Sequence, residues 1–327
     1  MLRGHALANW LIHCADPLGP KTRPPRAQLP PSEADKLVAD AEAHGVLPAV
    51  LRSFPPFSGD RRFTVAREGA RARQRTAAAY AMMLRHHADA LLAAARGLPA
   101  TLVKGGTFAR ILYPEPIMRP YSDIDLLVAP HALPQVAAIL AAQDFELAED
   151  GQRSGRHEWK WLHRKNPAIL VEVHTNLVHA PSLRAALSLT YADIAENVES
   201  PAALLAIAAM HGGLHHFERL RQVVDICQAA RHLRRSEDER RLQSLLAGTG
   251  ARLAAITGLN LAHRFFAEAR CREIAQGLGR VRFAGIARVL IDRSVVASTM
   301  NEARFYHSWR RQGFRELLKR GKRSAVI

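Results

Sequence analysis

The sequence predicts an α+β protein, with a mixed α/β core between two mostly helical regions. Alanine, leucine and arginine dominate the composition and aromatic residues make up only 6%, a mixture that favours helices. Short β-type runs separated by turn residues occur only in the middle of the chain. We therefore expect a helical N-terminal region with a proline-rich linker (1–97), a core (98–198) and a helical C-terminal region with a basic tail (199–327).

The N-terminal region is expected to hold a short helix over 5–14, a proline-rich connector and two further helices. The connector DPLGPKTRPPRAQLPP contains six prolines, which favour an extended chain. A capping-box pattern after it opens a helix that runs to about His44. Residues 61–96 contain no proline and predict one long helix, which Gly97 and Pro99 end.

The core is expected to alternate strands and helices. A strand over 100–104 leads through a glycine pair into a short helix, and the run DIDLLVA after the next loop predicts a second strand. A helix over 131–143 follows, and then three strands within 144–176. This unit has the usual size of a domain.

The C-terminal region is expected to be helical, including stretches near 238–247, 251–269 and 285–300. It ends in the basic amphipathic stretch EARFYHSWRRQGFRELLKRGKR. Phe305 and Trp309 are one helical turn apart. They indicate either an aromatic helix face that packs on the rest of the protein or a site that contacts a nucleic-acid backbone. We prefer packing for the aromatic residues and nucleic-acid contact for the terminal RGKR.

The charge of the chain points to an anionic partner. A formal net charge of +16 and a pI of about 10.7 suit nucleic acid or a phosphate-rich substrate, although an arginine-rich composition alone would give the same balance. Three scattered cysteines without a C-x-x-C pair indicate neither a disulfide framework nor a zinc knuckle. With no secretory signal and no apolar run of ~18 residues, we expect a cytoplasmic protein without membrane contact.

Two carboxylates stand at the start of the second predicted strand. Asp123 and Asp125 are two residues apart in RPYSDIDLLV, so strand alternation points both toward the same face. Like charges that close raise each other's pKa unless a cation lies between them. The pair therefore indicates a metal site, and a solvated strand edge is the structural alternative.

A glycine turn and a third acid accompany this pair. Lys104, Gly105, Gly106 and Thr107 join the first strand to a helix, where free N–H groups bind phosphate, although a glycine pair alone is often an ordinary turn. Glu172 lies between Val171 and Val173 in a later strand and has a face to itself. Three carboxylates and a phosphate-binding turn can thus converge on Mg²⁺.

These residues resemble the DNA polymerase β-like nucleotidyltransferase superfamily. The signature there is a Gly-Gly or Gly-Ser turn at a helix start, then Asp-x-Asp, then a third acid on a neighbouring strand. The stretches LVKGGTFARILYPEPIMRPYSDIDLLV, VEVH and MHGGLHHFERLRQVVDI are similar to bacterial nucleotidyltransferase family proteins. The resemblance covers about 98–230 and implies a core with a mixed sheet.

The resemblance implies a role for each acid. Asp123 and Asp125 would bind two Mg²⁺ ions, with Mn²⁺ as an alternative. Glu172 would complete one metal site and help deprotonate the acceptor hydroxyl. This third acid is usually Asp, so the longer side chain of Glu172 is a departure from the pattern.

It also implies nucleotide-binding residues. Gly105, Gly106 and Thr107 would hold the β- and γ-phosphates of an NTP such as ATP, and Lys104 and Arg119 would lie on the phosphate side. Arg119 also has the option of pairing with an acid.

Four histidines are further candidates for the site. His174 follows Glu172 on the same face and would orient a carboxylate or touch substrate, unless it is a structural histidine. His211, His215 and His216 suggest a metal site because positions i and i+4 share a helix face, but a glycine pair weakens that helix and no H-E-x-x-H pattern is present. We prefer a structural role there and leave open a substrate-side role for His211.

The predicted function is Mg²⁺-dependent transfer of a nucleoside monophosphate from an NTP to a hydroxyl acceptor, with release of pyrophosphate. The basic balance favours an RNA end such as tRNA as the acceptor. One alternative is a catalytically inactive nucleotide- or nucleic-acid-binding protein of the same fold. Another is a small-molecule nucleotidyltransferase that acts on an antibiotic or a sugar. The oligomeric state is not predicted.

Overall fold

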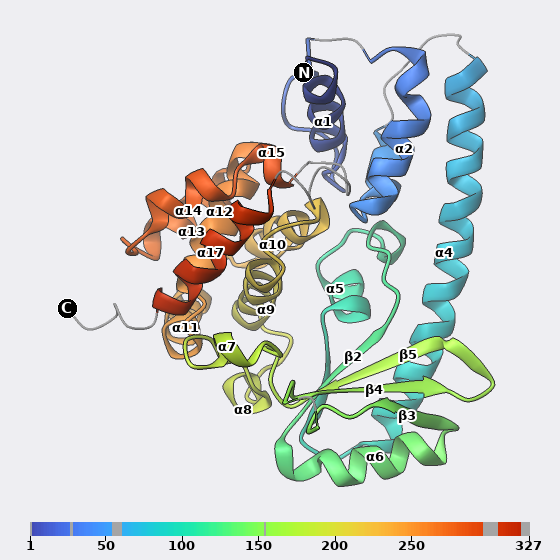
Figure 1. Cartoon of the computed structure of the whole chain (residues 1–327), viewed down its shortest axis with the longest axis vertical. Coiled ribbons are helices and arrows are strands. Elements are labelled where there is room, and N and C mark those ends of the chain that lie inside the picture. Colours follow the sequence, from blue (N-terminus) through green and yellow to red (C-terminus); the bar gives the residue numbers. More distant parts are fainter. Residues whose placement is uncertain (1, 27–28, 54–60, 154, 297–306, 322–327) are drawn as a thin grey trace.

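The computed structural model describes residues 2–26, 29–53, 61–153, 155–296 and 307–321. A single five-stranded mixed sheet lies at one end of the molecule, and helices make up most of the rest (Figure 1). The predicted α+β class, with helical regions on both sides of the core in sequence, is confirmed.

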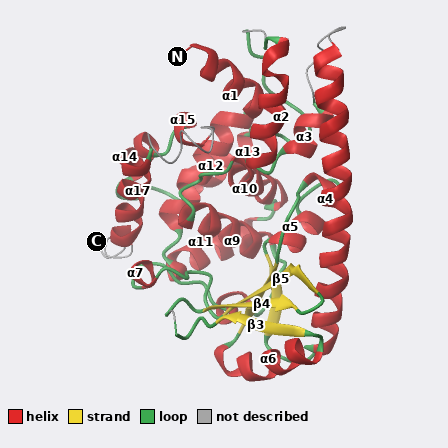
Figure 2. Cartoon of the chain, turned by 45° about the vertical axis from the view of Figure 1, so that its right-hand side comes forward, coloured by secondary structure: helices red, strands yellow, loops and turns green. Residues whose placement is uncertain are grey.

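The N-terminal region is helical, as expected. Its elements are α1 (Leu2–Cys14), a 3₁₀ turn (Pro31–Glu33), α2 (Ala34–Ala43), α3 (Leu47–Arg52) and α4 (Arg61–Ala94). The predicted capping box forms no side-chain cap at α2, which follows the 3₁₀ turn instead. Most of the expected loop SFPPFSGD lies outside the described residues. The long helix α4 is confirmed and runs along the whole molecule (Figures 1 and 2).

The core contains five strands and short helices. The strands are β1 (Ala100–Val103), β2 (Ile124–Val128), β3 (Phe145–Glu149), β4 (Glu158–His163) and β5 (Asn166–His174). The helices are α5 (Gly105–Ile111), α6 (Leu133–Ala142) and two 3₁₀ turns, Pro116–Met118 and Pro130–Ala132. The sheet order is β1-β2-β5-β4-β3, in which β2 and β5 run parallel and every other pair is antiparallel.

The two faces of the sheet differ in chemistry. On one face, Ile124, Leu126, Val171 and Val173 pack in a core with α6 and with Leu84 of α4. The opposite side of the sheet is turned toward α5 and the C-terminal helices. Asp125 of β2 and Glu172 of β5 lie on that side. Alternation along the strands explains the separation, because apolar and acidic residues occupy alternate positions.

The C-terminal region consists of helices. These are α7 (Pro181–Arg184), α8 (Tyr191–Ile194), α9 (Pro201–Leu214), α10 (Leu220–His232), α11 (Ser236–Thr249), α12 (Arg252–Phe266), α13 (Ala269–Gly277), α14 (Ala284–Leu290), α15 (Arg293–Val296) and α17 (Ser308–Gly321). The stretch expected to be helical near 285–300 forms two helices within the described residues, α14 and α15. They divide at Ile291, which is extended and fully buried, and Asp292 then accepts hydrogen bonds from Ser294.

The terminal helix α17 packs through different residues from those expected. Phe314 and Leu318 are buried, whereas the Trp309 side chain is 67% exposed. The predicted packing of Trp309 is therefore wrong, because the apolar stripe of α17 contains Phe314, Leu317 and Leu318 and faces away from Trp309. Phe305 and the last two residues of the RGKR motif, Lys322 and Arg323, lie outside the described residues.

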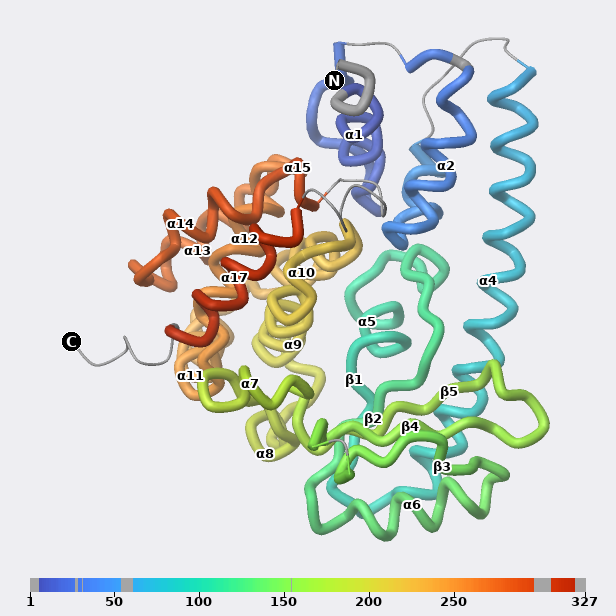
Figure 3. The backbone as a smooth tube through the Cα atoms, in the orientation of Figure 1, coloured from blue at the N-terminus to red at the C-terminus, as the bar shows by residue number. Residues whose placement is uncertain are grey.

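Helices from both ends of the chain share one hydrophobic core. It joins residues of α1, α2 and α3 with those of α9, α10 and α12, and Figure 3 shows the two groups meeting. Arg231 of α10 strengthens this junction because it forms ion pairs with Asp16 and Glu268. The domain boundaries proposed from the sequence stay a prediction.

Candidate active site

A polar cavity of about 410 Å³ lies between the acidic face of the sheet and the helices α9 and α10. Side chains from the core and from the C-terminal region both line it. The lining residues are Lys104, Gly105, Arg119, Tyr121, Ser122, Asp123, Asp125, Glu158, Lys160, Glu172, His179, His211, His215, Glu218, Arg219, Arg221 and Gln222.

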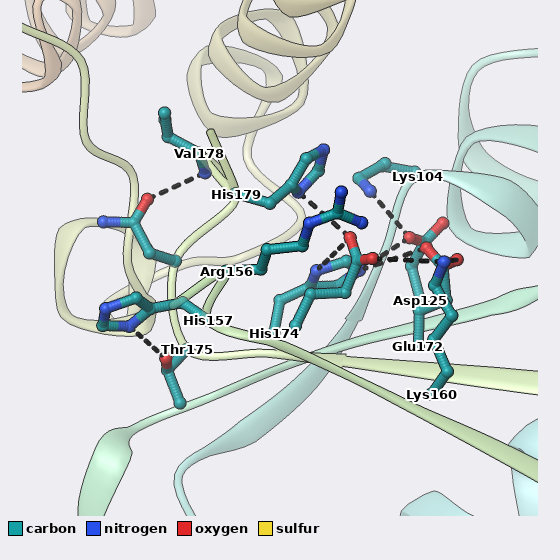
Figure 4. A network of polar contacts seen from close by, with 12 residues as sticks. Lys104, Asp125, Arg156, His157, Lys160, Glu172, His174, Thr175, Val178 and His179 are labelled. Carbon is teal, nitrogen blue, oxygen red and sulfur yellow. Dashed lines mark hydrogen bonds and ion pairs between the residues drawn. The ribbon is translucent and has the colours of Figure 1, made fainter. Parts of the chain in front are cut away.

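Asp125 is the centre of a buried network on this face (Figure 4). The parallel register pairs Asp125 of β2 with Glu172 of β5, which places both carboxylates on the same side of the sheet. Lys104 Nζ donates to Asp125 Oδ1 over 2.7 Å, and His174 Nε2 donates to the same oxygen over 3.0 Å. Ligand atoms of Asp125, Glu172 and His174 all lie within 4.8 Å of one another.

The charges around Asp125 keep it ionised. Burial by itself would raise the pKa of Asp125, but the Lys104 ammonium and the hydrogen bond from His174 lower it well below its ordinary value. Burial also lowers the pKa of His174, whose side chain is fully enclosed. Asp125 therefore presents a fixed, fully charged carboxylate to the cavity.

The neighbouring acids carry more negative charge than the protein neutralises. Burial, together with the charges of Asp125, Glu158 and Asp123, raises the pKa of Glu172 to about 7. Burial and the Asp125 carboxylate likewise raise the pKa of Asp123. Lys160 Nζ is 4.0 Å from Glu172 Oε1 and offsets this charge only in part. Such an excess of oxygen ligands matches the chemistry of a hard divalent cation.

Asp123 lies at the mouth of this group. It directly precedes β2 and lines the cavity beside Tyr121 and Ser122. Among the described residues, no hydrogen bond or ion pair holds its carboxylate. Asp123 is therefore free to bind a ligand, although it is outside the set of three whose atoms lie within 4.8 Å.

The predicted glycine turn begins with a residue in the left-handed region, and an aromatic ring packs against its glycines. Lys104 has a φ of 51° and directly precedes α5. A β-carbon at Gly106 would lie 3.3 Å from Tyr121 Oη, so the ring leaves little room for a side chain there. Lys104 and Gly105 line the polar cavity, whereas Gly106 and Thr107 line a second hollow of about 490 Å³ between α4 and β1.

Arg119 is buried in a different arrangement from the one expected on the phosphate side. Its Nε and Nη2 donate to Asp225 Oδ1 and Oδ2 of α10 over 2.7 and 2.9 Å. Its Nη1 donates to the carbonyl oxygen of Gly105 over 3.0 Å, and Tyr113 Oη donates to Asp225 as well. Arg119 thus connects the glycine turn to the C-terminal region.

The comparison with known families agrees with this geometry. A family model described as an uncharacterised nucleotidyltransferase matches residues 30–267, a range that contains every site residue predicted above. The chain belongs to this nucleotidyltransferase family. No curated protein and no solved structure matches it. The wider polymerase β-like superfamily and a bacterial origin stay predictions.

His211 lines the cavity of the nucleotidyltransferase without touching its carboxylates. It is half-buried in α9, and its ring stands edge-on to the ring of His215 at 4.8 Å between centroids. Burial, followed by the charge of His215, lowers the pKa of His211 well below its ordinary value. A neutral His211 faces whatever enters the cavity from the helical side.

Three charged or ionisable residues close to Glu172 and His174 were not among the predicted site residues. Glu158 and Lys160 of β4 pair with His174 and Glu172 of β5, and His179 follows in the next loop. Alternation in the run EWKW places Glu158 and Lys160 on one face, which was a usable signal. Their position beside Glu172 depends on strand register, which that run does not reveal.

A membrane-spanning segment does not occur in the described part of the nucleotidyltransferase, where no helix combines the length and the apolar character needed to cross a bilayer.

Proposed function

We propose that this protein transfers a nucleoside monophosphate from an NTP to a hydroxyl acceptor and releases pyrophosphate. The proposal is carried by the cluster of Asp125, Glu172 and His174, whose two carboxylates line one polar cavity, together with membership of a nucleotidyltransferase family. These residues come from strands that are far apart in sequence but paired in the sheet.

Asp123, Asp125 and Glu172 would hold two Mg²⁺ ions, or Mn²⁺ ions in their place. The raised pKa values of Asp123 and Glu172 support this fit, because burial and the neighbouring carboxylates disfavour their charged forms and a bound cation would offset both effects. When bound, the metal would neutralise phosphate charge and activate the attacking hydroxyl. His174 and Lys104 keep the Asp125 carboxylate oriented for this task.

Glu172 is suited to accept the proton of the acceptor hydroxyl. Before a metal binds, burial raises the pKa of Glu172 to about 7, so this carboxyl exchanges its proton near neutral pH. The hydroxyl oxygen forms a bond to the α-phosphorus and its proton moves to Glu172. The bond from the α-phosphorus to the bridging oxygen breaks, and that oxygen leaves with pyrophosphate.

The glycine turn would hold the leaving phosphates. Lys104 and the backbone of Gly105 face the cavity, and Gly106 and Thr107 form the next residues of the same turn. Because Arg119 donates to the carbonyl of Gly105, it acts on the phosphates by positioning this turn. In this proposal Arg119 is a positioning residue.

An RNA end is the acceptor that the charge favours. The net charge is +16, and the first half of α4 exposes a series of arginines. They are Arg61, Arg62, Arg67, Arg71 and Arg75. The cavity itself is lined by five acids and five lysines or arginines, a balance that gives no special preference for a polycationic small molecule such as an aminoglycoside.

Label transfer tests the proposal. The purified protein is incubated with Mg²⁺, RNA-containing cell extract and α-³²P-labelled ATP, CTP, GTP or UTP in turn. Asp125→Asn removes a central ligand, and Asp144→Asn is the matched control because Asp144 is an exposed aspartate paired with Lys165 at the far end of the sheet. We expect labelled RNA from the wild type and from Asp144→Asn, and none from Asp125→Asn.

The other outcomes separate the alternatives. Label in a small molecule would retain the reaction and replace the RNA acceptor. Mg²⁺-dependent NTP binding without transfer to any fraction would favour a catalytically inactive nucleotide-binding protein. Equal transfer by Asp125→Asn and the wild type would refute the proposed site.

A further inference from the structure

We propose that Glu158, His174 and His179 form a second metal site, for a nitrogen-binding dication such as Zn²⁺. One ligand atom from each residue lies within 4.8 Å of the other two. Glu158 and His174 are buried, and Glu158 and His179 line the same cavity as the nucleotidyl-transfer site. The proposal concerns metal binding and does not depend on the transfer reaction.

The unsatisfied nitrogens of the two histidines are the first argument. His174 is fully buried, and its Nδ1 lies 3.7 Å from Glu158 Oε2 without a hydrogen bond to any described residue. His179 Nδ1 lies 3.1 Å from the same oxygen, also without hydrogen-bond geometry. Buried polar atoms normally have partners, so two ring nitrogens around one carboxylate oxygen require an explanation.

The proton of His174 is already engaged elsewhere. A neutral imidazole carries one N–H, and Nε2 donates it to Asp125 Oδ1 over 3.0 Å. The Nδ1 lone pair is therefore left facing the Glu158 carboxylate, an unfavourable contact between two electron-rich atoms. A cation between them turns that contact into two bonds.

The donor set favours a transition-metal ion over Mg²⁺. Two imidazole nitrogens and one carboxylate oxygen are ligands that Zn²⁺ takes in open sites, whereas Mg²⁺ prefers oxygen alone. Metal-bound histidines usually donate their other N–H to a carboxylate, and His174 does so to Asp125. The remaining coordination position faces the cavity, where water or a phosphate oxygen would occupy it.

Rigid elements hold the three ligands. Glu158 and His174 are cross-strand partners at adjoining ends of β4 and β5. The loop that carries His179 is fixed by Asn176, whose side chain accepts from Val178 N over 2.9 Å and donates to Ser188 Oγ. Lys160 lies 3.6 Å from Glu158 Oε1, which leaves Oε2 for the metal.

Cobalt binding tests this site directly. The chelator-treated protein is titrated with Co²⁺ in saturating Mg²⁺, which fills the oxygen-ligand site, and the visible absorption of Co²⁺ is followed. We expect one Co²⁺ per chain with the absorption of nitrogen ligation, and competition by Zn²⁺. His179→Asn should weaken this binding by at least ~10-fold, since even the loss of an outer partner of a metal ligand costs that much.

Two variants control the measurement. His157→Asn removes a neighbouring imidazole that is turned toward Thr175 (Figure 4), so it should bind Co²⁺ like the wild type. Asp123→Asn should keep the Co²⁺ absorption while weakening Mg²⁺ binding. Unchanged Co²⁺ affinity in a folded His179→Asn variant would overturn the proposal. Loss of the Co²⁺ absorption in Asp123→Asn would also overturn it, because the ion would then occupy the oxygen-ligand site.

Discussion

The buried ion pair between Arg119 and Asp225 should contribute more to stability than any exposed pair of the same chemistry. The two side chains are 2% and 1% exposed and meet through two hydrogen bonds of 2.7 and 2.9 Å. Asp225→Asn keeps the shape but removes the charge, and so leaves the Arg119 guanidinium buried without its counter-ion.

The magnitude follows from this burial. Removing one partner of a buried pair costs about 3–5 kcal/mol. A typical protein has only about 5–15 kcal/mol of unfolding free energy, so Asp225→Asn should remove a large part of it. The pair of Arg110 with Glu199 is the control, because its side chains are 50% and 48% exposed. Glu199→Gln should cost no more than about 1 kcal/mol.

Urea unfolding followed by far-ultraviolet circular dichroism measures both variants. We expect a clearly lower midpoint for Asp225→Asn and a nearly unchanged midpoint for Glu199→Gln. The double replacement Arg119→Met with Asp225→Leu should recover part of the loss, because it removes both charges together. Equal midpoints for Asp225→Asn and Glu199→Gln would refute the reasoning.

Four further predictions follow from the site and the packing. Because burial raises the pKa of Glu172 to about 7, its proton must leave before Mg²⁺ binds, so Mg²⁺ affinity measured by calorimetry should fall about tenfold per pH unit below 7 and should lose this dependence in Glu172→Gln. The raised pKa of Glu172 also makes the stability of the protein depend on pH. Without metal, the native carboxyl keeps its proton while the unfolded chain releases it, so the wild type should lose stability relative to Glu172→Gln as the pH rises from 4.5 to about 7. Gly258→Ala should lower the free energy of unfolding by about 1–3 kcal/mol, and the thermal midpoint with it, because a β-carbon there would collide with a side chain of α10. Gly248 lies in open space, so Gly248→Ala should leave the free energy of unfolding unchanged or raise it by up to about 1 kcal/mol. Phe314→Ala should cost about 3–5 kcal/mol in urea unfolding and Trp309→Ala no more than about 0.5 kcal/mol, and similar costs for the two would contradict the packing of α17.

Local patterns in the sequence determined the elements and the type of chemistry. The proline-free segment before Gly97 predicted α4, and alternation predicted the strands that carry Asp125 and Glu172. These features depend on neighbours a few residues apart, which a single sequence displays directly. The family match then agreed with the motif-based expectation of a nucleotidyltransferase.

Only the tertiary structure decided which of these residues meet. The parallel register of β2 and β5 sets Glu172 beside Asp125, and β4 adds Glu158 to the same face. Arg119 binds Asp225 across 106 positions of the chain, a pairing that no local pattern indicated. Local pattern fixes the face on which a side chain lies, but strand register and helix packing come from contacts between distant segments. Those contacts are decided by burial in the folded chain as a whole.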